Sequence, residues 1–202
     1  MEEEKVYTLL KNELGAGRLP KDILKACQGG MKIVGELYKK EEYFVADLMY
    51  AGEIMRRVMK MLEPHMKGSE RLDKIGTVVM GTVKGDIHDL GKDVVIITLQ
   101  GNGFEVVDLG VDVPAEKFVE AIKKNNPQLI GLSVFLTACF EQAAKIVKAI
   151  KDAGLREKMK IMIGGAPVTD MIAEQTGCDF FGTDAAAGTS YALKVVGAFG
   201  AS

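Results

Sequence analysis

The stretch that decides the fold is Ile75-Gly76-Thr77-Val78-Val79-Met80, an apolar run that leads into the loop Gly85-Asp86-Ile87-His88-Asp89-Leu90-Gly91. The run is short, partly β-branched and bounded by polar residues and glycine, which predicts a buried strand. The apolar residues at 94–99 have the pattern of the inner face of a helix. His88 therefore lies beyond the carboxyl end of a strand, where open α/β sheets bind ligands.

The loop contains one of only two histidines in the chain. An imidazole can bind a metal through one nitrogen while a carboxylate holds the other N–H and fixes the tautomer. Asp86, two residues before His88, is the candidate for that carboxylate. The loop alone does not establish a metal site, because Asp89 can serve only to cap the following helix and His88 can be an ordinary loop residue.

Composition sets broad limits on the function. The 202 residues suffice for one large domain or two small ones, and 48% hydrophobic with 27% charged residues is typical of a soluble globular protein. A net charge of -2 gives no indication of a nucleic-acid or membrane-surface partner. Three cysteines without paired spacing predict reduced thiols. No signal peptide or membrane span is expected, so the predicted location is the cytoplasm.

The first third of the chain is predicted to be helical. Apolar residues at helical spacing form three stripes, at 6–14, 23–38 and 45–62. Helices of this length are too short to be stable alone, so they must pack together or on a neighbour. The frequent methionines are flexible apolar side chains, and we expect most of them in an ordinary bundle core. The alternative is that part of the bundle caps a large apolar ligand.

Beyond residue 74 the pattern alternates between strands and helices. Strands are predicted near 75–80, 104–109, 128–133, 160–163 and 179–182, and helices near 90–101, 115–125, 138–153, 168–176 and 185–199. Five strand–helix units predict a parallel sheet covered on both faces, with right-handed crossovers. The polar segment 67–74 is the predicted linker, which divides the chain into a helical domain at 1–70 and an α/β domain at 71–202.

Two later stretches follow strands at the same sheet edge as the loop. Forty-one residues separate Gly91 from Ser133, and twenty-eight separate Phe135 from the pair Gly164-Gly165. A serine hydroxyl can hydrogen-bond a ring nitrogen, and a glycine pair lets a ligand approach the backbone closely. Each stretch alone is explained more simply by a local backbone bond or a turn. Their joint placement favours a ligand site.

The order Asp86-x-His88-x-x-Gly91, Ser133-x-Phe135 and Gly164-Gly165, at these gaps, resembles the cobalamin-binding module of methionine synthase. It also resembles the small corrinoid proteins of methanogen and acetogen methyltransferase systems. The segments 82–92 and 107–114 resemble the family throughout, and the helical third resembles its four-helix cap. The resemblance covers nearly the whole chain. It implies an N-terminal helical bundle cap followed by a Rossmann-like five-stranded parallel sheet with helices on both faces.

The resemblance also implies residue roles around cobalamin or a related corrinoid. His88 is implied as the lower axial ligand of cobalt, in place of the cofactor's own base, with Asp86 hydrogen-bonded to its other nitrogen. The nucleotide tail is implied to run into the sheet, where Ser133 contacts its nucleobase. Tyr38 and Val45, with Phe44 as a further candidate, are implied over the upper face. The implied cofactor-binding set in the α/β domain is Gly85, Asp86, Ile87, His88, Asp89, Gly91, Ser133, Phe135, Thr137, Gly164 and Gly165.

Two positions depart from the family pattern. Phe135 replaces the usual leucine, which keeps the site apolar and changes the shape of the tail pocket. Cys139 stands where methionine synthase carries a serine linked to the Asp–His pair. A thiol is a weak donor, so the implied proton relay stops at Asp86 or continues through water.

The implied function is a methyl carrier, which shuttles a methyl group on cobalt between a donor-specific and an acceptor methyltransferase. A reductive activase is a further possible partner, and neither nucleic acid nor membrane is expected. The chain shows no second motif for a substrate site and is too short for the folate and homocysteine modules of methionine synthase. We therefore expect a non-catalytic carrier subunit. Methylamines, methanol, methoxylated aromatics and betaines all remain open as methyl donors.

Three alternatives come from other classes of protein. A cobalamin-dependent sensor or regulator usually adds a DNA-binding segment, and no basic helix is present. A flavin or nucleotide module of flavodoxin type leaves Asp86, His88 and the glycine pair unexplained. A mutase subunit is less expected to carry a helical cap.

Overall fold

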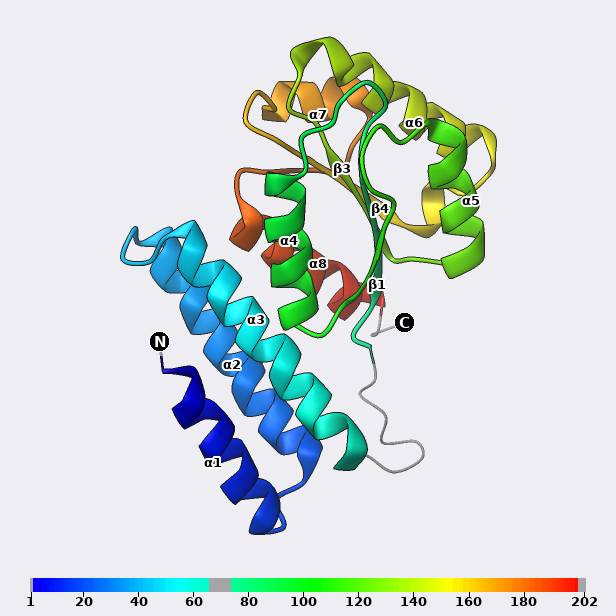
Figure 1. Cartoon of the computed structure of the whole chain (residues 1–202). Coiled ribbons are helices and arrows are strands. Elements are labelled where there is room, and N and C mark those ends of the chain that lie inside the picture. Colours follow the sequence, from blue (N-terminus) through cyan, green and yellow to red (C-terminus); the bar gives the residue numbers. More distant parts are fainter. Residues whose placement is uncertain (1, 66–73, 200–202) are drawn as a thin grey trace. The chain divides into compact units, whose positions relative to one another are not determined.

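The structure is a computed structural model that describes residues 2–65 and 74–199, without the side chains of 198 and 199. Most of the predicted linker, residues 67–73, and the predicted domain boundary after residue 70 lie outside these residues. The chain divides into two compact units, Met1–Lys74 with Ile97–Gly103, and Ile75–Ile96 with Phe104–Ser202 (Figure 1). No helix in the described ranges is both long and apolar enough to cross a membrane.

The first unit is helical. Its own helices are α1 (Glu3–Gly15), α2 (Pro20–Lys39) and α3 (Val45–Leu62), followed by the 3-10 turn η1 (Glu63–His65). Proline at the first position of α2 lacks only an N–H that would be unpaired there. The core contains buried side chains from all three helices, namely Tyr7, Leu10, Ile23, Met31, Leu48, Ile54, Met55, Val58 and Leu62. The three predicted stripes therefore correspond to these three helices.

A fourth helical segment of the first unit comes from later in the chain. Residues 97–101, the end of α4 (Leu90–Gly101), belong to this unit. At Gly52 an added Cβ would lie 2.3 Å from Cγ2 of Ile97, so a glycine permits this contact within the unit. The resemblance implied a four-helix cap, and the described part of residues 1–70 supplies three α-helices of it.

The second unit contains one parallel sheet of five strands in the order β2-β1-β3-β4-β5. The strands are β1 (Thr77–Thr82), β2 (Glu105–Asp108), β3 (Leu129–Ser133), β4 (Lys160–Gly164) and β5 (Phe180–Gly182). The helices that follow α4 are α5 (Ala115–Asn125), α6 (Phe140–Asp152), α7 (Asp170–Thr176) and α8 (Ala185–Phe199). The predicted fold class, a helical cap followed by a Rossmann-like α/β fold, is confirmed.

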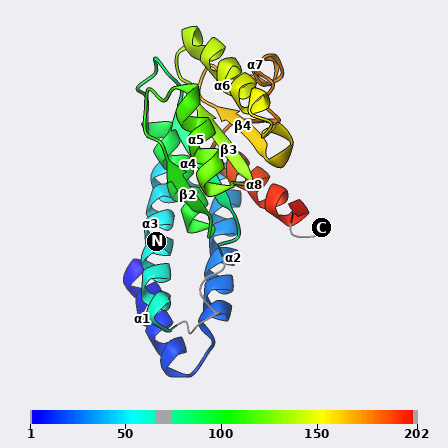
Figure 2. The same ribbon diagram turned by 90° about the vertical axis from the view of Figure 1, so that its right-hand side faces the viewer.

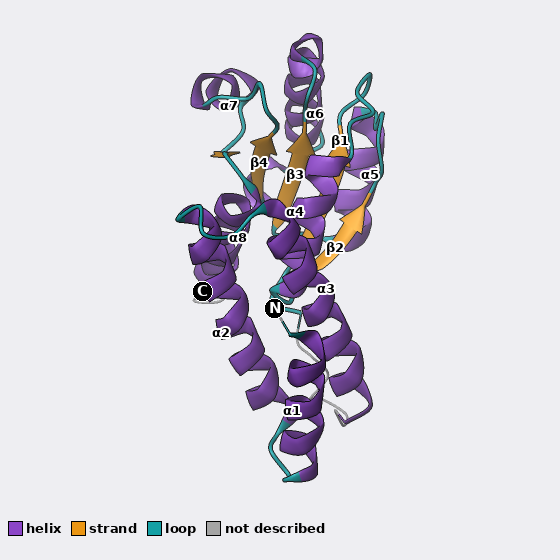
Figure 3. Cartoon of the chain, turned by 60° about the vertical axis from the view of Figure 1, so that its left-hand side comes forward, coloured by secondary structure: helices purple, strands orange, loops and turns teal. Residues whose placement is uncertain are grey.

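The strand order determines which helices cover which face. The chain moves one way from β1 to β2 and the other way from β2 through β3 and β4 to β5. Right-handed crossovers then place α4 on one face and α5, α6 and α7 on the other. Figure 2 views the sheet from the side of α5, whereas Figure 3 views it from the side of α4, where α8 also lies. Buried residues of α5 and α6 pack on Val79, Ile130, Leu132, Ile161 and Ile163.

The register sets the last row of the sheet on the α4 and α8 face. Thr82 pairs with Ser133, Ser133 with Gly164, and Gly164 with Gly182. Side chains alternate along a strand, and the neighbouring residues of β3 and β4 face α5 and α6, so this row faces the opposite way. Small residues therefore line the carboxyl edge on the face of α4 and α8.

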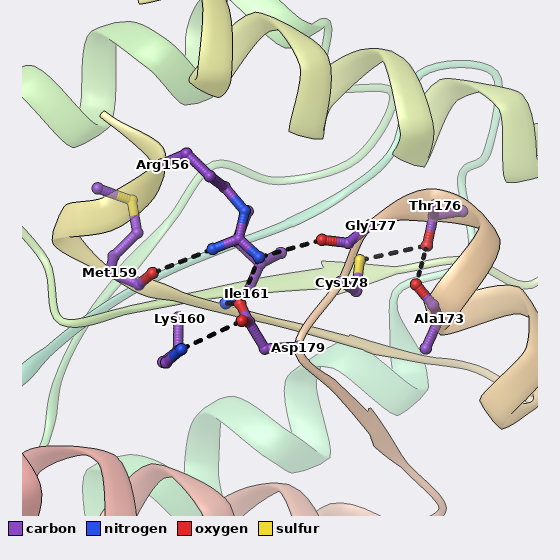
Figure 4. Close-up of polar contacts among 9 residues, drawn as sticks. All are labelled: Arg156, Met159, Lys160, Ile161, Ala173, Thr176, Gly177, Cys178 and Asp179. Carbon is purple, nitrogen blue, oxygen red and sulfur yellow. Dashed lines mark hydrogen bonds and ion pairs between the residues drawn. The ribbon is translucent and has the colours of Figure 1, made fainter. Parts of the chain in front are cut away.

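The opposite, amino-terminal edge of the sheet is held by an ion pair (Figure 4). Arg156, in the turn before β4, donates to the Asp179 carboxylate at 2.8 Å, and the same carboxylate accepts the N–H of Ile161 at 2.8 Å. Burial raises the pKa of Asp179, but the Ile161 N–H and the Arg156 charge outweigh it and lower the pKa. This cluster joins the starts of β4 and β5 and has a structural role far from the loop at 85–91.

Candidate functional site

Asp86 is the centre of the site. Its side chain is fully buried, and both carboxylate oxygens accept hydrogen bonds. Oδ1 lies 2.7 Å from His88 Nδ1 and 3.1 Å from the His88 backbone nitrogen. Oδ2 accepts the backbone N–H groups of Phe135 at 2.6 Å and Leu136 at 3.0 Å. The structure thus joins the loop after β1 to the loop after β3 through one carboxylate.

The hydrogen bonds keep this carboxylate ionised. Burial alone would raise the pKa of Asp86, but the bonds from His88 and from the N–H groups of Leu136 and Phe135 lower the pKa to about 2. An ionised carboxylate can only accept hydrogen bonds, so His88 carries its proton on Nδ1. The other nitrogen, Nε2, then keeps its lone pair for a metal or a donor.

The ring of His88 is accessible at this position. Its side chain is 48% exposed and stacks on Phe135, with ring centroids 4.3 Å apart and planes at 29°. Large apolar side chains beside it are exposed as well, at 72% for Ile87, 71% for Leu90 and 39% for Leu136. Several exposed apolar side chains around one polar group are typical of a ligand-binding surface. The arrangement suits a large apolar ligand that carries a metal.

Two residues without a predicted role, Thr82 and Asp112, fix the loop. Thr82, fully buried, donates from Oγ1 to the carbonyl of His88 at 3.0 Å. Asp112 accepts the N–H of Gly85 at 2.7 Å through Oδ1 and donates its own N–H to the carbonyl of Asp86 at 2.9 Å. Gly85 adopts a φ of +85°, which favours glycine. Sequence reasoning placed Thr82 and Asp112 in family-like segments and assigned them no role.

A buried lysine anchors the start of α4. The side chain of Lys92 is 2% exposed, and its Nζ lies 2.8 Å from both carboxylate oxygens of Asp108 and 2.9 Å from Oδ1 of Asp93. Burial lowers the pKa of Lys92, but the two carboxylates outweigh it and raise the pKa. Sequence reasoning missed this cluster, which joins the end of the loop to the end of β2.

The other predicted residues of the second unit lie at the carboxyl edge. Ser133 and Gly164 occupy the last row of the sheet, and Thr137 is exposed at the start of a 3-10 turn. Gly165 has a φ of +142°, and a Cβ there would lie 1.8 Å from the Val134 carbonyl oxygen, so only glycine fits. A Cβ on Gly91 would meet nothing within 4 Å, which leaves open space beside the loop.

Two further predicted positions border the loop. Asp89 immediately precedes α4, and its carbonyl accepts the N–H of Asp93 at 2.8 Å, as at a helix start. Cys139 is buried, 3.4 Å from where a Cβ on Gly85 would lie. Burial raises the pKa of the Cys139 thiol, and the charges of Asp86 and Asp112 raise it further. Oδ2 of Asp86, the oxygen that does not face His88, already accepts two backbone N–H groups, so it does not need a hydrogen bond from the thiol.

The predicted cap residues belong to the first unit. Tyr38 lies in the last turn of α2, Phe44 directly precedes α3 and Val45 begins it. The side chains of Phe44 and Val45 are exposed, and the Phe44 N–H donates to Asp47 at 2.9 Å. The structure therefore brings these three residues to the turn between α2 and α3.

The described ranges contain no group of three or more His, Cys, Asp or Glu side chains that could hold a metal ion. His88 therefore offers a single ligand, and one imidazole does not by itself make a closed metal site. A metal bound here must bring most of its own ligands, as the metal of a macrocycle does.

Comparisons with known proteins address the same question independently. Residues 76–192 match the family described as B12 binding domain, and residues 1–63 match a second family with the same description. The chain is 38% identical over 199 residues to the trimethylamine corrinoid protein of Methanosarcina barkeri, covering 96% of this chain and 92% of that protein. It is 38% identical over 167 residues to dimethylamine corrinoid protein 1 of Methanosarcina mazei, covering 83% and 77%.

Solved structures give the same result. A novel cobalamin-binding protein from Desulfitobacterium hafniense superposes with a TM-score of 0.84 at 35% identity, covering 96% of this chain and 92% of that one. The methanol:cobalamin methyltransferase complex MtaBC from Methanosarcina barkeri matches with a TM-score of 0.85 at 28% identity, covering 97% and 75%. Both the fold and the sequence of these proteins are therefore similar to those of this chain.

Proposed function

We infer the function from the premise that this chain belongs to the corrinoid proteins of methyltransferase systems and that its cofactor is cobalamin or a related corrinoid. It acts as a methyl carrier, receiving a methyl group from a donor-specific methyltransferase and giving it to an acceptor methyltransferase. The names of its relatives support this: they are corrinoid proteins for trimethylamine and dimethylamine, and the MtaBC complex is a methyltransferase. Methylated amines and methanol are accordingly the first donors to test.

The residues of the second unit fit a corrinoid. His88 would hold the metal of the corrinoid through Nε2, and the macrocycle would supply most of the other ligands. The exposed side chains of Ile87 and Leu90 would supply apolar contacts to the macrocycle. This assignment is supported by the buried Asp86 bond to Nδ1, since that bond fixes the tautomer in which Nε2 can coordinate.

The nucleotide tail needs a separate place once His88 occupies the axial position. The last row of the sheet offers it, because Gly164 and Gly182 leave two adjacent strand ends without side chains beside Ser133. Gly165 brings the loop after β4 close to the end of β3. A Cβ added at Gly165 would lie 1.8 Å from the carbonyl oxygen of Val134. Gly91 and Thr137 border the entrance.

The helical domain at 1–70 serves as a cap over the α/β domain at 71–202. Tyr38, Phe44 and Val45 would supply apolar contacts from the cap to the bound corrinoid. Apolar side chains exposed at one turn are suited to this role. A partner methyltransferase must displace the cap to reach the methyl group, as substrates displace enzyme lids.

The corrinoid and the chain have separate roles in this function. When bound, the corrinoid supplies a cobalt centre that accepts and releases the methyl group. The chain binds and orients the cofactor, and Asp86 holds the proton of His88 on Nδ1. Because Asp86 has a pKa of about 2, its carboxylate is ionised at neutral pH and can accept the Nδ1–H hydrogen bond. The chain itself acts as the carrier subunit.

The observation that carries this function is the 2.7 Å hydrogen bond between Asp86 and His88 Nδ1, on a His88 side chain that is half exposed. We would reconstitute the full chain, uniformly labelled with ¹⁵N, with unlabelled cobalamin and record electron paramagnetic resonance of the Co(II) form. Coordination by His88 predicts that the nitrogen hyperfine pattern changes from that of a spin-1 to that of a spin-½ nucleus. The His88→Ala variant should lose this pattern. A pattern unaffected by labelling the protein would refute the axial role.

A further inference from the structure

Thr189, on α8, is the one buried side chain in the described residues with a polar atom that lacks a hydrogen-bond partner. Its side chain is buried, on the helix face that also buries Ala185, Ala192 and Val195. Thr176, a buried threonine on α7, instead donates to the carbonyl of Ile172 at 2.7 Å. The Thr176 hydroxyl thus has a partner within its own helix, whereas the Thr189 hydroxyl has none. Buried polar groups in native proteins are nearly always paired, so an unpaired one requires an explanation.

Gly188, the residue before Thr189, lies near glycines of the neighbouring strands. A Cβ on Gly164 would lie 3.3 Å from the Gly182 carbonyl oxygen, and one on Gly182 would lie 3.8 Å from Cα of Gly188. A Cβ on Gly188, the neighbour of Thr189, would lie 3.8 Å from Sδ of Met162. Three glycines from β4, β5 and α8 therefore meet where the sheet ends. We call this place the glycine slot and define it as Gly164, Gly182 and Gly188.

The side-chain atoms nearest the glycine slot belong to Met162 and Phe180. Met162 lies on β4, and the rings of Phe180 and Tyr191 stack beside it with centroids 4.2 Å apart and planes at 5°. A phosphate would be expected to meet arginine, lysine or several N–H donors. A flat, mostly apolar ring with one hydrogen-bonding atom matches this lining better.

We propose that Thr189 donates a hydrogen bond to the lower base of the corrinoid, which enters the glycine slot, and that this bond selects the base. The assignment rests on the proposed function, in which His88 displaces that base from cobalt. The displaced benzimidazole then carries a free ring nitrogen with a lone pair, and the Thr189 hydroxyl is a donor without a partner. Thr189 is a specificity residue for the form of corrinoid that is bound.

Thr189→Val separates this role from a structural one. Valine keeps the shape and removes the unsatisfied hydroxyl, so the protein without cofactor should be as stable as the wild type or more stable. Cobalamin affinity, measured by absorbance titration of the full chain, should fall about threefold to tenfold. A merely structural threonine would give the reverse, a less stable protein with unchanged affinity.

Two other ligands localise the effect to the base. Cobinamide lacks the nucleotide and the lower base, so wild type and Thr189→Val should bind it equally. A cobamide with a p-cresol base lacks the ring nitrogen. The wild type should bind that cobamide more weakly than cobalamin, and Thr189→Val should weaken its binding no further.

Two variants serve as controls. Thr176→Val removes a satisfied hydroxyl, so it should lower stability and leave cobalamin affinity unchanged. Gly182→Ala makes only ordinary contacts in the structure and should fold, but its methyl group narrows the glycine slot. It should weaken binding of cobalamin and not of cobinamide.

The outcomes distinguish the two proposals. If the wild type binds neither cobalamin nor cobinamide, the proposed function fails and this inference fails with it. If it binds cobalamin and Thr189→Val binds it equally well, the function stands and the role of Thr189 is refuted. A loss of affinity that is the same for cobalamin and cobinamide would also refute it.

Discussion

Asp86→Asn should weaken both the fold of the second unit and the ligation by His88. The Asp86 carboxylate accepts four N–H groups, two at each oxygen. Asparagine has one acceptor oxygen and an NH₂ group that only donates. If its oxygen keeps the Phe135 and Leu136 N–H groups, its NH₂ faces His88. The imidazole must then present Nδ1 as the acceptor and carry its proton on Nε2, which is the wrong tautomer for a metal.

The magnitude follows from the pKa. A fall from an ordinary 3.8 to about 2 corresponds to about 2 kcal/mol of stability from the ionised Asp86 side chain. Because the pKa is lowered in the folded state, this stability is present in full above about pH 4, the pKa of the unfolded chain. It is lost as the pH falls toward 2. Asp86→Asn should therefore be about 2 kcal/mol less stable than the wild type at pH 7, and this gap should close between about pH 4 and pH 2.

Urea unfolding of the protein without cofactor, from pH 7 downward, measures this gap. Glu120→Gln, the same kind of change at an exposed position of α5, should leave stability nearly unchanged. After reconstitution with cobalamin, Asp86→Asn should also lose the ¹⁵N-dependent hyperfine pattern. A gap below about 0.5 kcal/mol at pH 7, or one that stays constant down to pH 3, would refute the account of Asp86.

Three other substitutions test the surrounding structure. Lys92→Met leaves the half-exposed Asp108 without its partner and should cost about 1–2 kcal/mol in urea unfolding, less than a fully buried pair would. Gly165→Ala forces a Cβ to 1.8 Å from the Val134 carbonyl, so expression in soluble form should fall and the melting temperature should drop sharply. Phe135→Leu removes the ring stacked on the imidazole and should lower the free energy of unfolding by about 1 kcal/mol in urea titrations. The less restrained imidazole should also give broader signals in NMR spectra.

The fold could be predicted from the sequence because its signals are local. Every predicted strand and helix after residue 74 exists, with ends within two or three residues of the prediction. The deviations have local causes. Helix α6 begins at Phe140, not 138, because Thr137–Cys139 forms a 3-10 turn. Helix α7 begins at Asp170, not 168, because Thr169 caps it by accepting the N–H of Ile172.

The contacts that fix the site were harder to predict because their partners lie far apart in the sequence. Asp86 and His88 are two residues apart and were paired from spacing alone. The N–H groups that satisfy the second oxygen of Asp86 come from Phe135 and Leu136, about fifty residues later. Phe135 was predicted as a cofactor-binding residue that departs from the family pattern, and its stacking on the His88 ring was not foreseen. Nearly every residue has a backbone N–H, so the residue type does not indicate which N–H groups bind Asp86.

The same reasoning explains why Thr189 was missed and why it is informative. A threonine on a helix has no sequence signal for being unsatisfied, because it ordinarily bonds a carbonyl one turn earlier, as Thr176 does. Its unpaired state becomes visible only when the neighbouring backbone and the surrounding glycines are known. Both oxygens of the Asp86 carboxylate already accept N–H groups of the chain, so this carboxylate needs no partner from a ligand. The Thr189 hydroxyl has no such partner, and a ligand that satisfies it must extend from the carboxyl edge of the sheet to α8.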